Sequence, residues 1–110
     1  MINSATFRII GRIGSLNTMD KVTHLSIASD RRMKDHDGSW ITGTDWNSVT
    51  ALSAKLRKRL EDETVARHGN LIVVEGTIQS SSYMKDGEKM YSTSLVVQDF
   101  DVLGFAKKPE

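Results

Sequence analysis

Trp46 has the sequence context of a flat binding platform. Polar and apolar residues alternate around it, so that Trp46 shares one parity with Ser48 while Val49 and Ala51 share the other. If Val49 and Ala51 face a core, Trp46 faces outwards, because successive side chains of a strand point to opposite sides. A solvent-facing tryptophan on a sheet is a surface on which a nucleobase can stack. The same context also allows a tryptophan that packs under a loop or in a contact between subunits.

Other aromatic residues stand close to positive charges. Tyr83 lies just before an Asp-Gly turn, two residues before Lys85, and could either stack on a base or pack within a hairpin. Trp40 and Met33 flank a charged segment. The nearby basic residues are Arg31, Arg32 and Lys34 in that segment, and Arg8 and Arg12 on one face of an earlier strand. Aromatic residues interleaved with Arg and Lys are typical of proteins that bind single-stranded nucleic acid with little sequence preference.

No group of residues predicts catalysis. The three histidines, His24, His36 and His68, have no spacing typical of metal ligands, and the chain has no cysteine that could act as a nucleophile or thiolate ligand. The two glycines of residues 11–14 do not form a phosphate loop, because the Gly-Lys-Ser/Thr ending is missing and no helix follows. We therefore expect a protein that is not an enzyme, with no catalytic residue, metal or cofactor.

Composition and charge fit a small polyanion-binding domain without excluding other roles. The 110 residues suffice for one domain, and no apolar run approaches the ~18–20 residues that span a membrane. With no secretory signal visible, we expect a cytoplasmic, nucleoid-associated protein without a membrane partner. The net charge of +1 divides into +5 for residues 1–59 and −4 for residues 60–110. The basic half suits a polyanion-binding surface, although such an imbalance can also be an ordinary solvated face.

The pattern of residues predicts three strands, a helix and two further strands. The strands are expected at residues 6–14, 22–29, 45–52, 71–79 (extending through 84) and 90–98, with a short final strand at 101–105 and a helix at 53–68. Residues 15–20 and 30–44 are expected to be connections, the second with an Asp37-Gly38 turn, and Asp86-Gly87 predicts another hairpin turn.

This order predicts an all-β fold with one helix. It is the order of the OB-fold, a five-stranded Greek-key barrel, whereas an SH3-like barrel has no natural place for a helix after the third strand. We expect a single OB-fold domain over residues 1–105 and a short C-terminal end at 106–110.

Several short motifs resemble the bacterial and mitochondrial single-stranded DNA-binding protein family. The likeness extends from about Thr6 to Gly104, and the order and spacing of the motifs are more specific than any one of them. The matching stretches are residues 9–14 (IIGRIG), 25–29 (LSIAS), 34–40 (KDHDGSW), 44–46 (TDW), 74–76 (VEG), 85–87 (KDG) and 91–93 (YST). The resemblance implies the OB-fold, single-stranded DNA as the partner, and roles in DNA replication, recombination and repair.

The resemblance also implies roles for individual residues. Trp46 matches the family's stacking tryptophan after an acidic residue, and Tyr83 falls where many members have another. Met33 and Leu52 fall where a tryptophan and a phenylalanine are usual, so apolar contacts would replace two stacking interactions. Residues 80–82, all serine, replace basic residues. The expected DNA-binding residues are Trp46, Tyr83, Trp40, Met33, Leu52, Arg8, Arg12, Arg31, Arg32, Lys34 and Lys85.

Two further expectations follow from the resemblance. Family members usually act as homotetramers, so we expect a homo-oligomer, with a tetramer favoured and a dimer as the alternative. The sequence ends without the family's glycine-rich linker and acidic tip. Either this member lacks recruitment of repair or replication enzymes through an acidic tail, so that such recruitment is not expected, or the chain is a truncated form.

The reduced set of aromatic residues keeps a second function open. An OB-fold accessory module, similar to primosome proteins or to accessory proteins of mobile elements, would bind protein first and DNA weakly. The retained Trp46 and the basic loop favour DNA.

Overall fold

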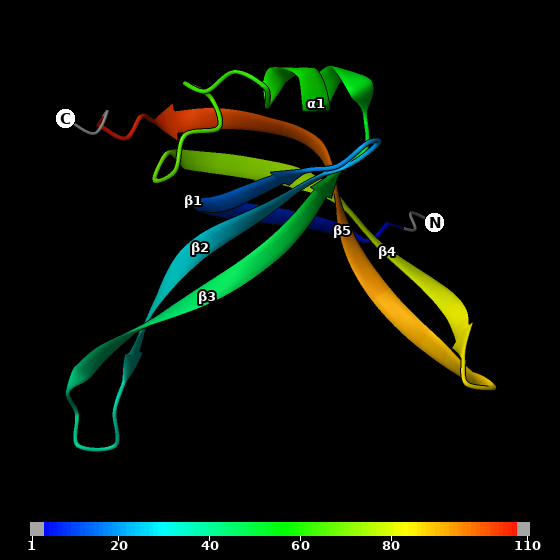
Figure 1. The fold of residues 1–110 in the computed structure, drawn as a ribbon. Helices are drawn as coiled ribbons and strands as arrows, with labels where there is room; N and C mark the ends of the chain where they lie inside the picture. Colours follow the sequence, from blue (N-terminus) through cyan, green and yellow to red (C-terminus); the bar gives the residue numbers. More distant parts are fainter. Residues whose placement is uncertain (1–3, 108–110) are drawn as a thin grey trace.

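Five strands close into a barrel in the order β1-β2-β3-β5-β4, as described by a computed structural model for residues 4–107 (Figure 1). The elements are β1 (Thr6–Thr18), β2 (Thr23–Lys34), β3 (Trp40–Ala51), α1 (Ala54–Arg59), β4 (Leu71–Lys85) and β5 (Glu88–Gly104). β1 pairs antiparallel with both β2 and β4, and a short parallel contact between β3 and β5 at Thr50 and Val96 closes the barrel. The prediction of a mostly β fold with one helix and a five-stranded OB-type barrel is confirmed. The last three residues of the expected C-terminal end, 106–110, lie outside the described residues.

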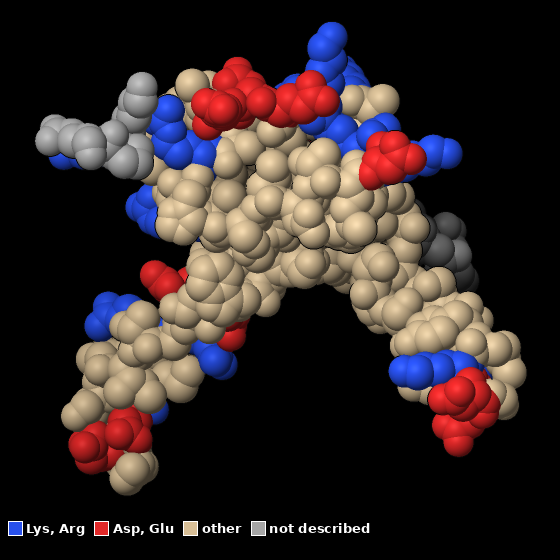
Figure 2. Space-filling view, in the orientation of Figure 1, with Lys and Arg blue, Asp and Glu red and all other residues tan. Residues whose placement is uncertain are grey.

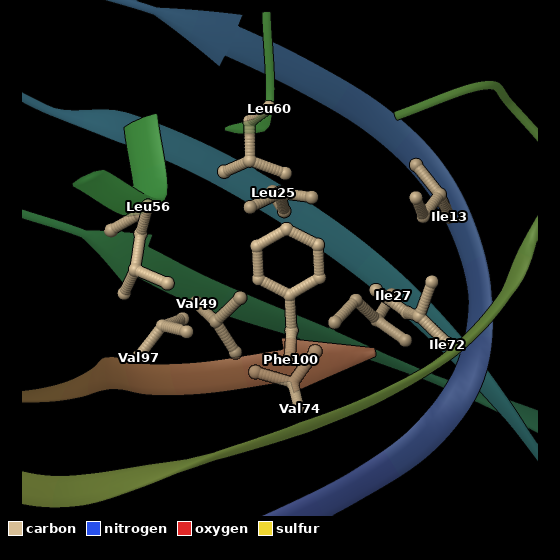
Figure 3. Packing of buried hydrophobic residues seen from close by; sticks show 11 residues of the cluster. Ile13, Leu25, Ile27, Val49, Leu56, Leu60, Ile72, Val74, Val97 and Phe100 are labelled. Atoms are coloured by element: carbon tan, nitrogen blue, oxygen red, sulfur yellow. The ribbon is translucent and has the colours of Figure 1, made fainter. Parts of the chain in front are cut away.

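The core is formed by the inward parity of the strands together with two leucines of the helical region (Figure 3). Leu60 points toward Leu25 and Phe100, and Leu56 points toward Val49, so α1 and its C-cap cover one end of the barrel. The buried apolar residues are Ile13, Leu25, Ile27, Val49, Ala51, Leu56, Leu60, Ile72, Val74, Val97 and Phe100. This alternation of buried and exposed residues is what fixes the face on which each outward side chain lies.

Two long hairpins extend from the barrel as separate arms (Figure 1). The β2–β3 arm was expected to be a connection over residues 30–44, but the ladder continues without a register shift from Thr23–Ala51 to Lys34–Trp40. The expectation failed because charged residues on both faces remove the polar–apolar alternation that marks a half-buried strand.

Both Asp-Gly turns are confirmed. Asp86 and Gly87 have φ of 52° and 82°, the left-handed region that a tight two-residue hairpin turn requires. At the other tip, the backbone N–H of Gly38 donates to the Asp35 carbonyl at 3.0 Å.

The helix is much shorter than the predicted span 53–68. It ends at Arg59 because the next residues form turns, where the Asp62 carboxylate accepts from the Thr64 N–H and hydroxyl at 2.9 and 2.7 Å. Ser53 is the N-cap residue but makes no side-chain capping bond. Gly69, at φ 91°, donates its N–H to the Ile13 carbonyl at 2.8 Å instead of closing a helix.

Two other strand limits also differ from the expectation. β1 continues to Thr18, through residues expected to be a connection. β5 is one strand rather than two, because the irregularity near Gln98 is a bulge: Glu75 lies opposite Asp99 while Gly76 lies opposite Val97.

Candidate nucleic-acid interface

Trp46 lies on the outer face of the sheet formed by β1, β2 and β3. Its side chain is 64% exposed, whereas Val49 and Ala51 are fully buried, so the outward parity is confirmed. In the register, Arg12 lies opposite Ala28 and Ala28 lies opposite Trp46. Arg12, Ala28 and Trp46 therefore occupy one transverse row of positions on the same face, while the Arg12 guanidinium itself donates to the Gly69 carbonyl.

Gly14 determines how the indole lies. A Cβ at Gly14 would clash with Cζ3 of Trp46 and lie 3.0 Å from Cη2 and 2.9 Å from Oγ of Ser26. The benzo edge of the Trp46 ring thus reaches across β2 to Gly14 of β1, next to the register shift between Ile13 and Ser15. The sequence did not predict this contact, since nothing local indicates which ring approaches Gly14.

The outer face continues along the β2–β3 arm. Trp40 has the same strand parity as Trp46 and is 58% exposed. The two indoles, six residues apart, are about 20 Å apart along an extended strand. Cζ of Arg32 lies 4.8 Å and Nζ of Lys34 lies 5.5 Å from the ring centroid of Trp40. Between the two tryptophans this face carries the carboxylate of Asp30, which accepts from the Thr44 hydroxyl, and then the cations Arg32 and Lys34 around Trp40. Aromatic rings and cations thus share one face, as in proteins that bind single strands.

Two of the expected site residues lie on the other face of the same arm. Met33 is opposite Ile41, and Arg31 is opposite Gly43. A guanidinium nitrogen of Arg31 lies 3.3 Å from Oδ1 of Asp45. The structure therefore separates Met33 and Arg31 from the row of tryptophans, and Arg31 already has a carboxylate partner.

The basic residues of β1 differ from each other. Arg8 pairs with Glu75 at 3.3 Å, on the side of the barrel next to β4. Arg12 donates to the Gly69 carbonyl at 2.9 Å and has no carboxylate partner among the described residues. Leu52, half exposed, follows β3 directly, so it lies beyond Trp46 at the barrel end of the surface.

The β4–β5 arm has an aromatic ring on each face. Tyr83, 50% exposed, lies opposite Met90, and Lys85 lies opposite Glu88. Tyr91 lies opposite Ser82 and therefore has the opposite orientation to Tyr83. Tyr91 was not among the expected site residues, because its strand parity is that of the apolar Leu95 and Val97.

Positive and negative charges are mixed on both arms (Figure 2). At the β2–β3 tip, the backbone N–H of Ser39 donates to Asp37, which keeps the pKa of that carboxyl below its ordinary value. The carboxylate of the neighbouring Asp35 lies 2.7 Å from the His36 ring. The tip therefore carries two carboxylates, whereas the cations Arg32 and Lys34 lie along the shaft of the arm.

A second acidic group lies on the far side of the barrel. Glu75, Asp99 and Asp101 gather there, and Arg59 is 3.3 Å from Asp99 and 3.9 Å from Asp101. Within residues 4–107, no three metal-ligating side chains come together and no helix has the length and apolarity to cross a bilayer.

The chain belongs to the single-strand binding protein family, whose model matches residues 5–103. This family consists of DNA-binding proteins, in agreement with the expectation that the chain is not an enzyme. The motifs that predicted the resemblance lie within the matched range.

Two curated bacterial relatives are single-stranded DNA-binding proteins. The chain is 31% identical over 84 residues to the protein of Xanthomonas axonopodis pv. citri, covering 76% of this chain and 45% of that protein. It is 28% identical over 87 residues to single-stranded DNA-binding protein 1 of Chlorobaculum tepidum, covering 76% and 51%. The chain therefore spans about half the length of these relatives.

Solved structures agree on the fold. The mitochondrial single-stranded DNA-binding protein Rim1 of S. cerevisiae is 27% identical with a TM-score of 0.68, covering 96% of this chain and all of that one. The Plasmodium falciparum protein in complex with single-stranded DNA has a TM-score of 0.71, covering 97% and 98%. At 17% identity, the second likeness concerns the fold alone.

Proposed function

We propose that this protein binds single-stranded DNA largely without sequence preference and protects it during replication, recombination or repair. The observation that carries the proposal is Trp46, an exposed indole that reaches across the sheet to Gly14 and occupies one row of positions with Arg12. Family membership supports the same ligand.

The strand would follow the outer face of β1–β2–β3 and the shaft of the β2–β3 arm. Trp46 and Trp40 stack on bases, and Arg12, Arg32 and Lys34 bind phosphates. Leu52 supplies an apolar contact on this face, and Met33 supplies one only where the strand passes around to the other face of the arm. Arg8 and Arg31 contribute less, since each must exchange a carboxylate partner for a phosphate. Tyr83 and Lys85 extend the surface to the second arm.

The same proposal includes the assembly and the location of the protein. Apolar side chains exposed on the outside of the barrel, among them Ile10, Leu103 and Phe105, support a homo-oligomer, with a tetramer favoured over a dimer. The curated relatives are bacterial, which supports a place in the cytoplasm with the nucleoid. The DNA-binding unit is the OB-fold over residues 1–105. Light scattering of the purified protein measures the number of chains.

The experiment that tests the proposal is competition binding. A labelled oligo(dT) is bound at low salt and displaced with unlabelled single-stranded DNA of mixed sequence, with single-stranded RNA and with duplex DNA. Displacement by every single-stranded DNA at similar concentrations supports the proposal. Equal displacement by duplex DNA would show general polyanion binding instead.

A second candidate function is that of an OB-fold accessory module. The aliphatic Met33, which faces away from both tryptophans, and the serines at 80–82 favour it. An intact barrel that fails to bind oligo(dT) at low salt would support this module.

A further inference from the structure

We propose that Tyr91 and Lys89 form an additional single-nucleotide subsite on the β4–β5 arm, on the face opposite Tyr83. The inference rests on the proposed function and extends it to the face of this arm that carries none of the expected site residues.

The geometry of Tyr91 is that of an open platform. Its side chain is 72% exposed, more than Trp46 or Tyr83. Ser82, directly across the ribbon, is small, and the neighbour on the same strand face is Thr93. No bulky side chain lies opposite the ring, so a base has access to it.

Lys89 supplies the matching positive charge. Its Nζ lies 5.5 Å from the ring centroid of Tyr91, on the same face of the strand. Trp40 has the same arrangement, with Arg32 and Lys34 near its ring. An exposed cation–π contact is weak, at about 0.5–1 kcal/mol, so a base can take the place of the ammonium group on the ring. The flexible lysine then reaches the phosphate of the same nucleotide.

With Tyr83 on one face and Tyr91 on the other, each face of the β4–β5 arm has a ring on which a base can stack. Residues of opposite parity in a two-stranded ribbon point to opposite sides, and each tyrosine has a lysine two residues away in its strand. A strand that contacts both rings must pass around the ribbon. Tyr91 should therefore contribute to binding of long oligonucleotides and contribute little to short ones that contact only one face.

Photo-cross-linking tests the subsite directly. Oligo(dT) of about 35 nucleotides, with one 5-iodouracil placed at successive positions, is bound to the wild-type protein and irradiated, and adducts are mapped by mass spectrometry. We expect adducts at Trp46 and, for some placements, at Tyr91. In parallel, Tyr91→Leu should weaken binding of the long oligonucleotide by about 5- to 150-fold, while Tyr91→Phe binds as the wild type does.

Three results would overturn the subsite. Adducts at Trp46 but none at Tyr91, with full affinity in Tyr91→Leu, would remove Tyr91 from the DNA path. A loss of affinity in Tyr91→Leu accompanied by a smaller molecular mass would place the ring in a contact between copies of the chain. A loss accompanied by a lower melting temperature than that of Tyr91→Phe would make its role structural. If the wild-type protein itself bound no oligonucleotide at low salt, the result would contradict the proposed function, and not only the Tyr91 subsite.

Discussion

The exposure of Trp46 alone does not make its ring a good surface for stacking. The small residues around the ring, which restrain its position, are equally important. Gly14, Ser26 and Ala28 are small and lie under or beside the indole on two other strands. An indole confined by these neighbours loses little conformational freedom when a base stacks on it, so more of the stacking energy appears as affinity.

Removing this ring should therefore cost much of the affinity. We expect Trp46→Ala to weaken binding to oligo(dT) by about 1–3 kcal/mol, because one stacked base is lost. Trp46→Phe, which keeps a smaller ring, should lose less. Fluorescence anisotropy of a labelled oligonucleotide measures both. Unchanged affinity in a folded Trp46→Ala protein would place the DNA elsewhere.

The glycine beneath the ring gives a second test at the same scale. In Gly14→Ala the added Cβ meets the indole, so the ring must move and we expect a loss of about 1 kcal/mol of stacking. The tryptophan emission spectrum should shift as well. The control is Gly43→Ala on the other face of the arm, where a Cβ makes only ordinary contacts of 3.6 Å with Arg31 and Met33. Equal affinity in the two variants would contradict the positioning role.

At the scale of elements, the two arms and the connection after α1 differ in how they are held together. The arms depend on ladder hydrogen bonds and tight turns. The connection 60–70 has no regular ladder and is fastened by Asn70, which is fully buried. The Asn70 amide donates to the carbonyls of Thr64 and Val65 at 2.8 and 2.9 Å, and its oxygen accepts from the Ala106 N–H at 2.8 Å.

Replacing Asn70 should therefore destabilise the fold. Asn70→Ala leaves three backbone groups without their partner, and we expect unfolding to become easier by on the order of 3 kcal/mol. Urea denaturation measures the change, and Asn17→Ala, at an exposed position of β1, is the control. A midpoint for Asn70→Ala equal to that of the control would mean that Asn70 does not hold the connection.

These elements also show what the sequence could predict. The outward parity of Trp46, both Asp-Gly turns and the order of strands and helix follow from local patterns, which a barrel leaves intact. The length of β2 and β3 in the arm could not be predicted from the sequence, because residues 30–44 are solvated on both faces and show no polar–apolar alternation. The helix was overestimated because Leu56, Leu60 and Val65 reach the same core although only the first lies within α1. The Gly14–Trp46 contact joins distant residues, so no local pattern reports it.

At the scale of the whole molecule, the distribution of ion pairs is more informative than the net charge of +1. Arg8, Arg31 and Arg59 have carboxylate partners. In the described part of the chain, Arg32 and Lys34 on the outer face of the β2–β3 arm have none. Residues 1–59 carry a charge of +5, but Arg8, Arg31 and Arg59 are paired with carboxylates. The surface with unpaired positive charge is therefore smaller than the charge of +5 indicates.

This distribution predicts the salt dependence of binding. Each phosphate contact contributes about 0.7 to the slope of log affinity against log salt for a single strand. We expect Arg32→Gln and Lys34→Gln each to reduce the slope by about that amount. Lys55→Gln, in α1 at the opposite end of the barrel, should leave it unchanged (Figure 1). Equal slopes in all three variants would contradict the assignment of phosphate contacts.

The most direct test of the account uses the fluorescence of Trp46 alone. The chain has two tryptophans, so Trp40→Phe leaves Trp46 as the sole emitter. This variant is titrated with oligo(dT) at low and at moderate salt. The account predicts strong, saturable quenching, with an affinity that falls as salt rises, because a base stacks on Trp46 while nearby cations bind phosphates. An emission that stays constant at low salt, with no binding by anisotropy, would contradict it.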